Sequence, residues 1–351
     1  MQSLFKQTRT RVHSPSAQQQ QRQHGLAAAA RAMAAIQLGT QLLLWITFYG
    51  YDLVSQTVWQ AALMLFLPLA LLWLVWRGTS VDHPAARWWR LPLLLCLLAD
   101  AVLMITALGG FISQLVPTYP PWVCAAIPAA ICLLTALCAR PRGVRYGSAV
   151  LAVPLVLLLV FGTLFLRAST RPDRLWPILG DGLGSTAKTA LLGAGSTWGA
   201  ALLFALPQNR ANWKSSFWGI LPWLLCVLWA LRFGFVRPWS AGDDIAIAEK
   251  MMGLARHADS VILYETAGVM WMLLLPASLI ACFSTGEHLI TGVFPRLPRW
   301  AALVWLPALS LILPLFFTDR VFLWLGTLLP WRYPISLICG LGLLFLHRRR
   351  V

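Results

Sequence analysis

Ten apolar runs, each long enough to cross a lipid bilayer, limit what this sequence can fold into. A transmembrane helix needs about 20 mostly apolar residues, because the hydrocarbon core has no water to pair with backbone groups. We predict these spans at 27–50, 57–76, 91–116, 121–139, 147–167, 186–207, 215–236, 261–283, 300–317 and 331–347. Only 11 % of the residues are charged, against roughly 25 % in soluble domains. We therefore expect an all-α polytopic membrane domain over residues 26–351, after a disordered cytoplasmic tail over residues 1–25.

The net charge of +16 indicates membrane orientation and not a nucleic acid partner. The basic residues gather in the connections on one side of the predicted helices, and alternate connections carry fewer of them. Connections rich in lysine and arginine stay in the cytoplasm. We expect both termini on that side, since an even number of spans returns the chain to where it began.

The sequence lacks the motifs that are typical of active sites in soluble enzymes. It contains no GxSxG, HExxH or P-loop motif, and its seven cysteines form no CxxC pair. Its six histidines are scattered near predicted helix ends and connections. We expect no catalytic residue, no metal site, no cofactor and no enzymatic activity.

The stretch LLGAGSTWGA at 191–200 weakens the predicted sixth span. It contains three glycines, two hydroxyl residues and a tryptophan: Gly193, Gly195, Gly199, Ser196, Thr197 and Trp198. Glycine costs a helix about 1 kcal/mol relative to alanine, and unpaired backbone groups are costly in lipid. Two interpretations stay open. Either the small residues allow close packing of a neighbouring helix, or the helix is discontinuous and its free backbone groups line a ligand site.

A similar polar interruption, IQLGTQ at 36–41, lies in the predicted first span and includes Gln37, Gly39 and Thr40. Ten spans divide into two sets of five, at about 27–167 and 186–347, in which the first and sixth spans correspond. Because five is odd, the second set must be inverted relative to the first. Interruptions in corresponding helices of an inverted repeat are the best sequence indication of a midplane site. We expect substrate to bind between these two spans.

Ionisable residues within the predicted third and eighth spans, which also correspond, add a second pair of candidates. Asp100 lies inside the third span, on the same helical face as Cys96 and Gln114. Such a residue is a candidate for proton or cation coupling, or for contact with a ligand amine. The alternative is a structural hydrogen bond to a neighbouring helix. Glu265 lies in the first turns of the eighth span, nearer the external end, and is a second candidate for coupling or gating.

Three short motifs resemble the B subunits of spore germinant receptors. They are LWPILGDGLG at 175–184 ahead of the glycine-rich sixth span, LGTQLLLW in the first span, and YETAGVMWMLLL in the eighth. That family belongs to the amino acid–polyamine–organocation transporter superfamily. The resemblance implies a LeuT-type, five-plus-five inverted-repeat fold with discontinuous helices one and six. It also implies a substrate site between helices one, three, six and eight.

Membership of this superfamily raises the question of a coupling ion. The fifth span holds no internal lysine to stand in for sodium, and Trp198-Gly199-Ala200 lacks the acidic residue that the family often has there. By the resemblance, Ser278 in the eighth span would help backbone carbonyls of the first to hold a cation.

The leading functional hypothesis is a permease-like membrane protein that binds an amino acid or a similar small germinant. The ligand carboxylate would meet backbone N–H groups near Gly39 and Gly193, and Asp100 would meet the amine or carry a proton. Such a protein would be an amino acid transporter in the cell membrane, or a germinant receptor subunit that signals to partner subunits in the spore inner membrane.

Two alternatives belong to other functional classes. A membrane enzyme acting on lipid would use the connection with Asp173 and Asp181. A non-transporting scaffold predicts that Asp100→Leu is harmless or stabilising, because buried charges are replaceable by apolar residues.

Overall fold

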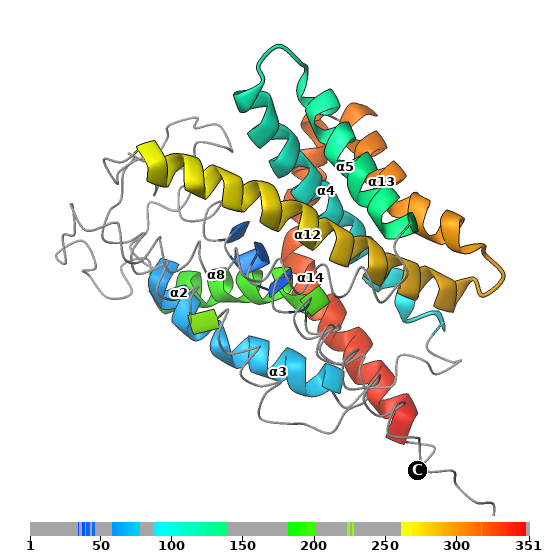
Figure 1. The fold of residues 1–351 in the computed structure, drawn as a ribbon. Coiled ribbons are helices and arrows are strands. Elements are labelled where there is room, and N and C mark those ends of the chain that lie inside the picture. The colour runs from blue at the N-terminus through cyan, green and yellow to red at the C-terminus, as the bar shows by residue number, and fades with distance from the viewer. Residues whose placement is uncertain are drawn as a thin grey trace, which may run out of the picture.

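The computed structural model describes residues 58–77, 87–138, 182–200, 261–316 and 318–348, with single positions within 34–45 and 223–227. Its helices, labelled in Figure 1, are α2 (Val58–Met64), α3 (Phe66–Arg77), α4 (Arg90–Leu115), α5 (Pro121–Cys138), α8 (Gly182–Ser196), α12 (Val261–Val293), α13 (Arg299–Phe316) and α14 (Thr318–Arg348). These described residues contain no strand, as expected for an all-α protein. By length and composition, three of the described helical segments are sufficient to cross a membrane: Arg90–Ser113, Trp271–Val293 and Leu328–Leu346.

Helices lie where the second, third, fourth, sixth, eighth, ninth and tenth spans are predicted. The described positions of the first and seventh spans are helical too, whereas the fifth span and the tail over 1–25 lie outside the described residues. The second span is split at Leu65 into α2 and α3. Pro68 explains the split, because proline has no N–H for the carbonyl four residues earlier and its ring crowds that turn.

Two helices extend beyond the apolar runs that predicted them. α12 continues to Val293, past the predicted end at 283, and α14 begins at Thr318, ahead of the predicted start at 331. In α12 the added residues are largely polar, because backbone hydrogen bonds continue past the apolar part of a helix until a breaker occurs. For α12 that breaker is Pro295, directly after Phe294, since a residue before proline is disfavoured in a helix. In α14 the added residues include the apolar run VFLWLGTLLP at 321–330, which the predicted span left out.

The described helices form two groups joined by α14 (Figure 1). In the first group α4 contacts α5, α12 and α13, and α5 also contacts α12 and α13. In the second group α8 contacts α2 and α3. α14 contacts α3 and α8 on one side and α4 and α13 on the other. A residue of α14 can therefore connect the two groups.

Contacts between the two halves join spans that are five apart in the chain. α4 packs on α12 and α5 packs on α13. Trp223, in the seventh span, donates from Nε1 to the Ala62 carbonyl at 2.9 Å, and its ring packs at a tilt on Phe66 with the ring centroids 5.0 Å apart. The Trp45 ring, in the first span, lies against Gly193 of α8. This pairing is compatible with a five-plus-five arrangement. The repeat itself stays a prediction, because the fifth span is outside the described residues.

Candidate functional site

The glycine-rich part of the sixth span contains a one-turn interruption. α8 ends at Ser196, Thr197 is in a turn, and the chain is helical again over 198–200. The Thr197 N–H donates to the Ala194 carbonyl at 3.2 Å, three residues back instead of four. The Ser196 hydroxyl donates to the Gly193 carbonyl at 2.6 Å, and the Thr197 hydroxyl donates to the Ala194 carbonyl at 2.8 Å. Both hydroxyl protons therefore stabilise the local backbone, which limits these residues to accepting hydrogen bonds from a ligand.

The three glycines of this stretch each face a close neighbour. A side-chain carbon built on Gly193 would lie 2.9 Å from the Trp45 ring, and one on Gly199 would lie 2.7 Å from the Gln37 amide nitrogen. At Gly195 the same carbon would lie 3.2 Å from the backbone nitrogen of Tyr333 in α14. Small residues thus let the first span and α14 approach α8, as helices in lipid require for tight packing. Close packing accounts for the glycines, and over residues 182–200, which the structure describes, the discontinuity is limited to the turn at Thr197.

The first span presents a row of buried polar groups to α8. Gln37, Thr40 and Gln41 are helical and at most 1 % exposed. Within the described part of the chain, the side-chain oxygens of all three, the Gln41 amide nitrogen and the Trp45 indole nitrogen have no hydrogen-bond partner. Residues at this spacing share one helical face. We call these four residues the first-span polar face. Leaving such groups unpaired is unfavourable, so the face is suited to a polar ligand or water.

Asp100 in α4 is the centre of a buried charged cluster. Its Oδ1 forms an ion pair with the Arg332 guanidinium of α14, and its Oδ2 accepts a hydrogen bond of 2.8 Å from the Trp198 indole. The carboxylate and guanidinium side chains are 1 % and 3 % exposed. Arg332 Nε also donates to the Leu329 carbonyl at 3.3 Å. The cluster thus connects α4, α14 and the helical segment that follows α8.

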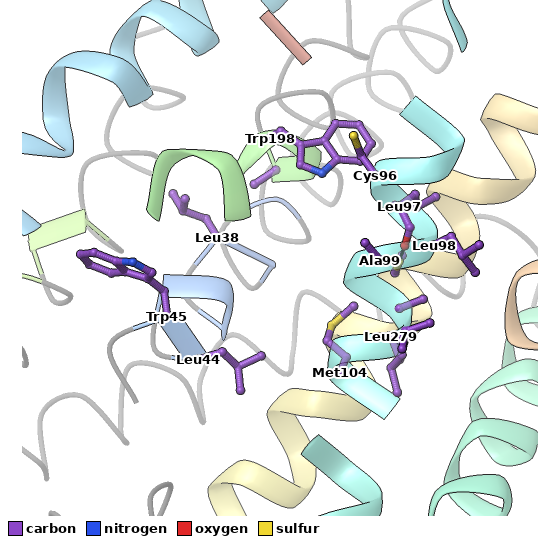
Figure 2. Packing of buried hydrophobic residues seen from close by; sticks show 14 of the residues in the cluster. Leu38, Leu44, Trp45, Cys96, Leu97, Leu98, Ala99, Met104, Trp198 and Leu279 are labelled. Carbon is purple, nitrogen blue, oxygen red and sulfur yellow. Dashed lines mark hydrogen bonds between the residues drawn. The ribbon is translucent and has the colours of Figure 1, made fainter. Parts of the chain in front are cut away.

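The charged cluster and the first-span polar face adjoin each other. Trp198, which donates to Asp100, is followed directly by Gly199, which contacts the Gln37 amide. Figure 2 shows Trp198 near the part of α4 that carries Cys96, one turn before Asp100, with Leu38 and Trp45 in the first span. The structure therefore brings predicted site residues of three spans together. Trp198 bonds to Asp100, Gln37 lies against the glycine that follows Trp198, Gly193 contacts Trp45, and Gly195 contacts Arg332.

Arg332 is the site residue that the sequence prediction missed. The tenth span is predicted from residue 331, which puts Arg332 at a membrane boundary where an arginine is ordinary. In the structure α14 begins at Thr318, so Arg332 lies in the middle of this helix and not at its end. The available signal was the apolar run VFLWLGTLLPW directly before it, together with an aspartate in another span that needs a positive partner.

The predicted coupling and gating residues other than Asp100 have no contact with this cluster in the described part of the chain, or lie outside it. Ser278 of α12 is fully buried, and its hydroxyl has no partner among the described residues. Glu265 lies in α12, but its side chain is not among those that the structure describes. Gly39, Asp173 and Asp181 lie outside the described residues altogether. Over the described residues, no group of three or more His, Cys, Asp or Glu side chains is positioned to hold a metal ion.

The fold has counterparts among solved structures. The manganese transporter of Eremococcus coleocola, in complex with an aromatic bis-isothiourea substituted compound, superimposes with a TM-score of 0.50 at 14 % identity, over 93 % of this chain and 76 % of that one. The chain has the fold of a membrane transporter. A variant of the same transporter with one histidine replaced by alanine gives a TM-score of 0.49 at 16 % identity, over 90 % and 74 % of the two chains. No protein-family model and no curated protein sequence matches the chain. Membership of the germinant receptor B-subunit family stays a prediction.

Proposed function

We propose that this protein is a membrane permease for a small zwitterionic solute, an amino acid or a close analogue. The observation that carries the proposal is the buried ion pair of Asp100 and Arg332 beside the unpartnered first-span polar face. The transporter fold supports it, since in such folds a solute binds near the midplane, where helices one and six are interrupted.

The ion pair matches a zwitterion in charge. A ligand ammonium group would pair with Asp100, and a ligand carboxylate would bind the planar guanidinium of Arg332. Buried charge would be balanced both before and after binding, because a zwitterion adds no net charge to the neutral ion pair. The amides of Gln37 and Gln41 and the hydroxyl of Thr40 would then pair with the remaining polar atoms of the solute.

A divalent cation fits the described site less well. The charge of Asp100 is already offset by Arg332, and the described residues supply no cluster of three metal-binding side chains around it. Divalent cations are held by several oxygen, nitrogen or sulfur ligands at once. The manganese named for the similar structure is therefore not the solute that we propose here.

The two alternatives predicted from sequence gain no support from this site. The residues of the lipid-enzyme hypothesis, Asp173 and Asp181, lie outside the described chain. The scaffold hypothesis predicted that Asp100→Leu is harmless, but that change would now leave the Arg332 guanidinium buried without its carboxylate. Removal of one partner of a buried pair is destabilising in a scaffold and in a transporter alike.

Uptake into proteoliposomes tests the proposal. Labelled L-amino acids are supplied as a panel, with labelled manganese as a separate arm, each with and without a pH gradient. We expect saturable accumulation of at least one amino acid, its loss in Gln41→Leu, and its retention in Glu287→Gln, which breaks only the partly exposed ion pair with Arg299. Uptake of manganese without any amino acid would overturn the proposal. Saturable binding without accumulation would support the site but overturn transport, and would indicate a sensing subunit such as those of germinant receptors.

A further inference from the structure

A carboxylate buried at membrane depth needs a positive partner. A proton, a metal ion, an organic cation or a basic side chain can supply it, and the choice decides whether the protein needs an ion from solution. At Asp100 the partner is part of the chain, because the guanidinium of Arg332 pairs with Oδ1. The Trp198 indole occupies Oδ2, so both carboxylate oxygens have a donor.

The position of Arg332 is fixed from its own helix and from α8. Its Nε donates to the Leu329 carbonyl one turn earlier, which orients the guanidinium. A carbon built on Gly195 would lie 3.2 Å from the Tyr333 backbone nitrogen, a tight contact, and 3.6 Å from the Arg332 Cβ, so the glycine lets α14 approach α8 closely beside Arg332. The guanidinium is therefore held beside Asp100 by packing as well as by charge.

Among the described residues, the other groups close to Asp100 offer few ligands for a cation from solution. The thiol of Cys282 donates to the Leu97 carbonyl at 3.8 Å, and Cys96 is buried one turn before Asp100 on α4. No three metal-binding side chains converge within the described residues. Hard cations such as sodium and manganese prefer several oxygen ligands, which these neighbours do not supply.

We propose that Arg332 is the resident counter-ion of Asp100 and takes the place that a coupling sodium or manganese ion would otherwise occupy. The protein then binds neither ion at Asp100, and sodium does not drive transport through this residue. The binding part of this inference stands by itself, whereas the transport part rests on the proposed function.

Thermal unfolding of the purified protein in detergent tests the binding part. The wild type is compared in sodium chloride, in choline chloride at equal ionic strength, and with added manganese chloride. We expect the same midpoint in all three. We also expect Arg332→Met to lower the midpoint by several degrees, and the double variant Asp100→Asn with Arg332→Met to regain most of that loss. Glu287→Gln is the control for an ion pair at the surface.

Two results would overturn the inference. One is a rise of the wild-type midpoint with sodium or manganese that disappears in Asp100→Asn. The other is a double variant no more stable than Arg332→Met, since the two charges would then not be partners. If either variant fails to fold, direct binding of radioactive sodium and manganese to the wild type decides the question. Saturable binding of either ion to the wild type overturns the inference, and no saturable binding of either ion supports it.

Uptake measurements test the transport part. With an amino acid that the panel identifies as a solute, we expect equal initial rates in sodium and in choline, and a strict sodium requirement would overturn this part. If no solute accumulates under any condition, the proposed function fails, and the thermal and binding results still decide whether Arg332 is the counter-ion.

Discussion

Substitution of Gly195 by alanine tests whether the glycines of the sixth span serve close packing. In the structure a methyl group on Gly195 would lie 3.2 Å from the backbone nitrogen of Tyr333 and 3.4 Å from its Cβ. The first distance is tighter than almost all real contacts of this kind, so α14 would have to move by a few tenths of an ångström. That movement also displaces the neighbouring Arg332 from Asp100.

The expected magnitude follows from two opposing effects. Alanine stabilises a helix by up to about 1 kcal/mol relative to glycine. Overpacking of a well-packed interior costs about 1–3 kcal/mol. For Gly195→Ala the net result is a loss of about 0–3 kcal/mol in the free energy of unfolding, by the difference of these effects.

A matched control separates the two effects. Gly184 lies in the same helix and has open space around it, with no atom within 4 Å of a built side-chain carbon. Gly184→Ala should therefore raise the free energy of unfolding by up to about 1 kcal/mol, the difference in helix propensity between alanine and glycine. The difference between the two variants isolates the packing cost, about 1–3 kcal/mol. Titration with a denaturing detergent, followed by tryptophan fluorescence, measures both. Equal changes of the same sign in the two variants would refute the packing explanation.

Three further substitutions probe other parts of the described site and its surroundings. Trp198→Phe removes the indole donor to Asp100 and should lower the free energy of unfolding by about 1.5–3 kcal/mol, the range for hydrogen bonds to charged groups. A loss below about 0.5 kcal/mol, as for surface changes, would contradict it. Ser278→Ala removes a buried hydroxyl that has no partner among the described residues, so stability should stay unchanged or rise by about 1 kcal/mol; a clear loss in the same detergent titration would show a partner. Glu287→Gln breaks an ion pair to Arg299, whose side chain is 42 % exposed, and should cost less than about 1 kcal/mol. A loss above about 2 kcal/mol would indicate a buried network instead.

The candidate site was predictable in part, and the reason differs between residues. Asp100 is recognisable from sequence because an acidic residue inside an apolar run is costly unless it has a partner. The identity of that partner is not local information. Arg332 is 232 positions away in the chain, and hydropathy puts it at the edge of a span. The packing of α14 against α4 brings it to Asp100.

The glycines show a similar division. Their spacing in LLGAGSTWGA indicates that the sixth span is unusual, but two physical causes produce the same pattern. Hydrogen bonds from Ser196 and Thr197 to their own backbone, and the neighbours at Gly193 and Gly195, show which cause applies. The residues that contact these glycines belong to other helices, so the sequence of one segment does not predict them.

The sequence by itself determined that this is an all-α membrane protein, because only helices satisfy the backbone of long apolar runs in lipid. It also determined most helix positions, since apolar length and proline act within one segment. The tertiary structure decided which polar groups meet. Asp100, Trp198 and Arg332 come from three separate segments, and charge pairing inside the membrane depends on distances that only the packing of those helices sets.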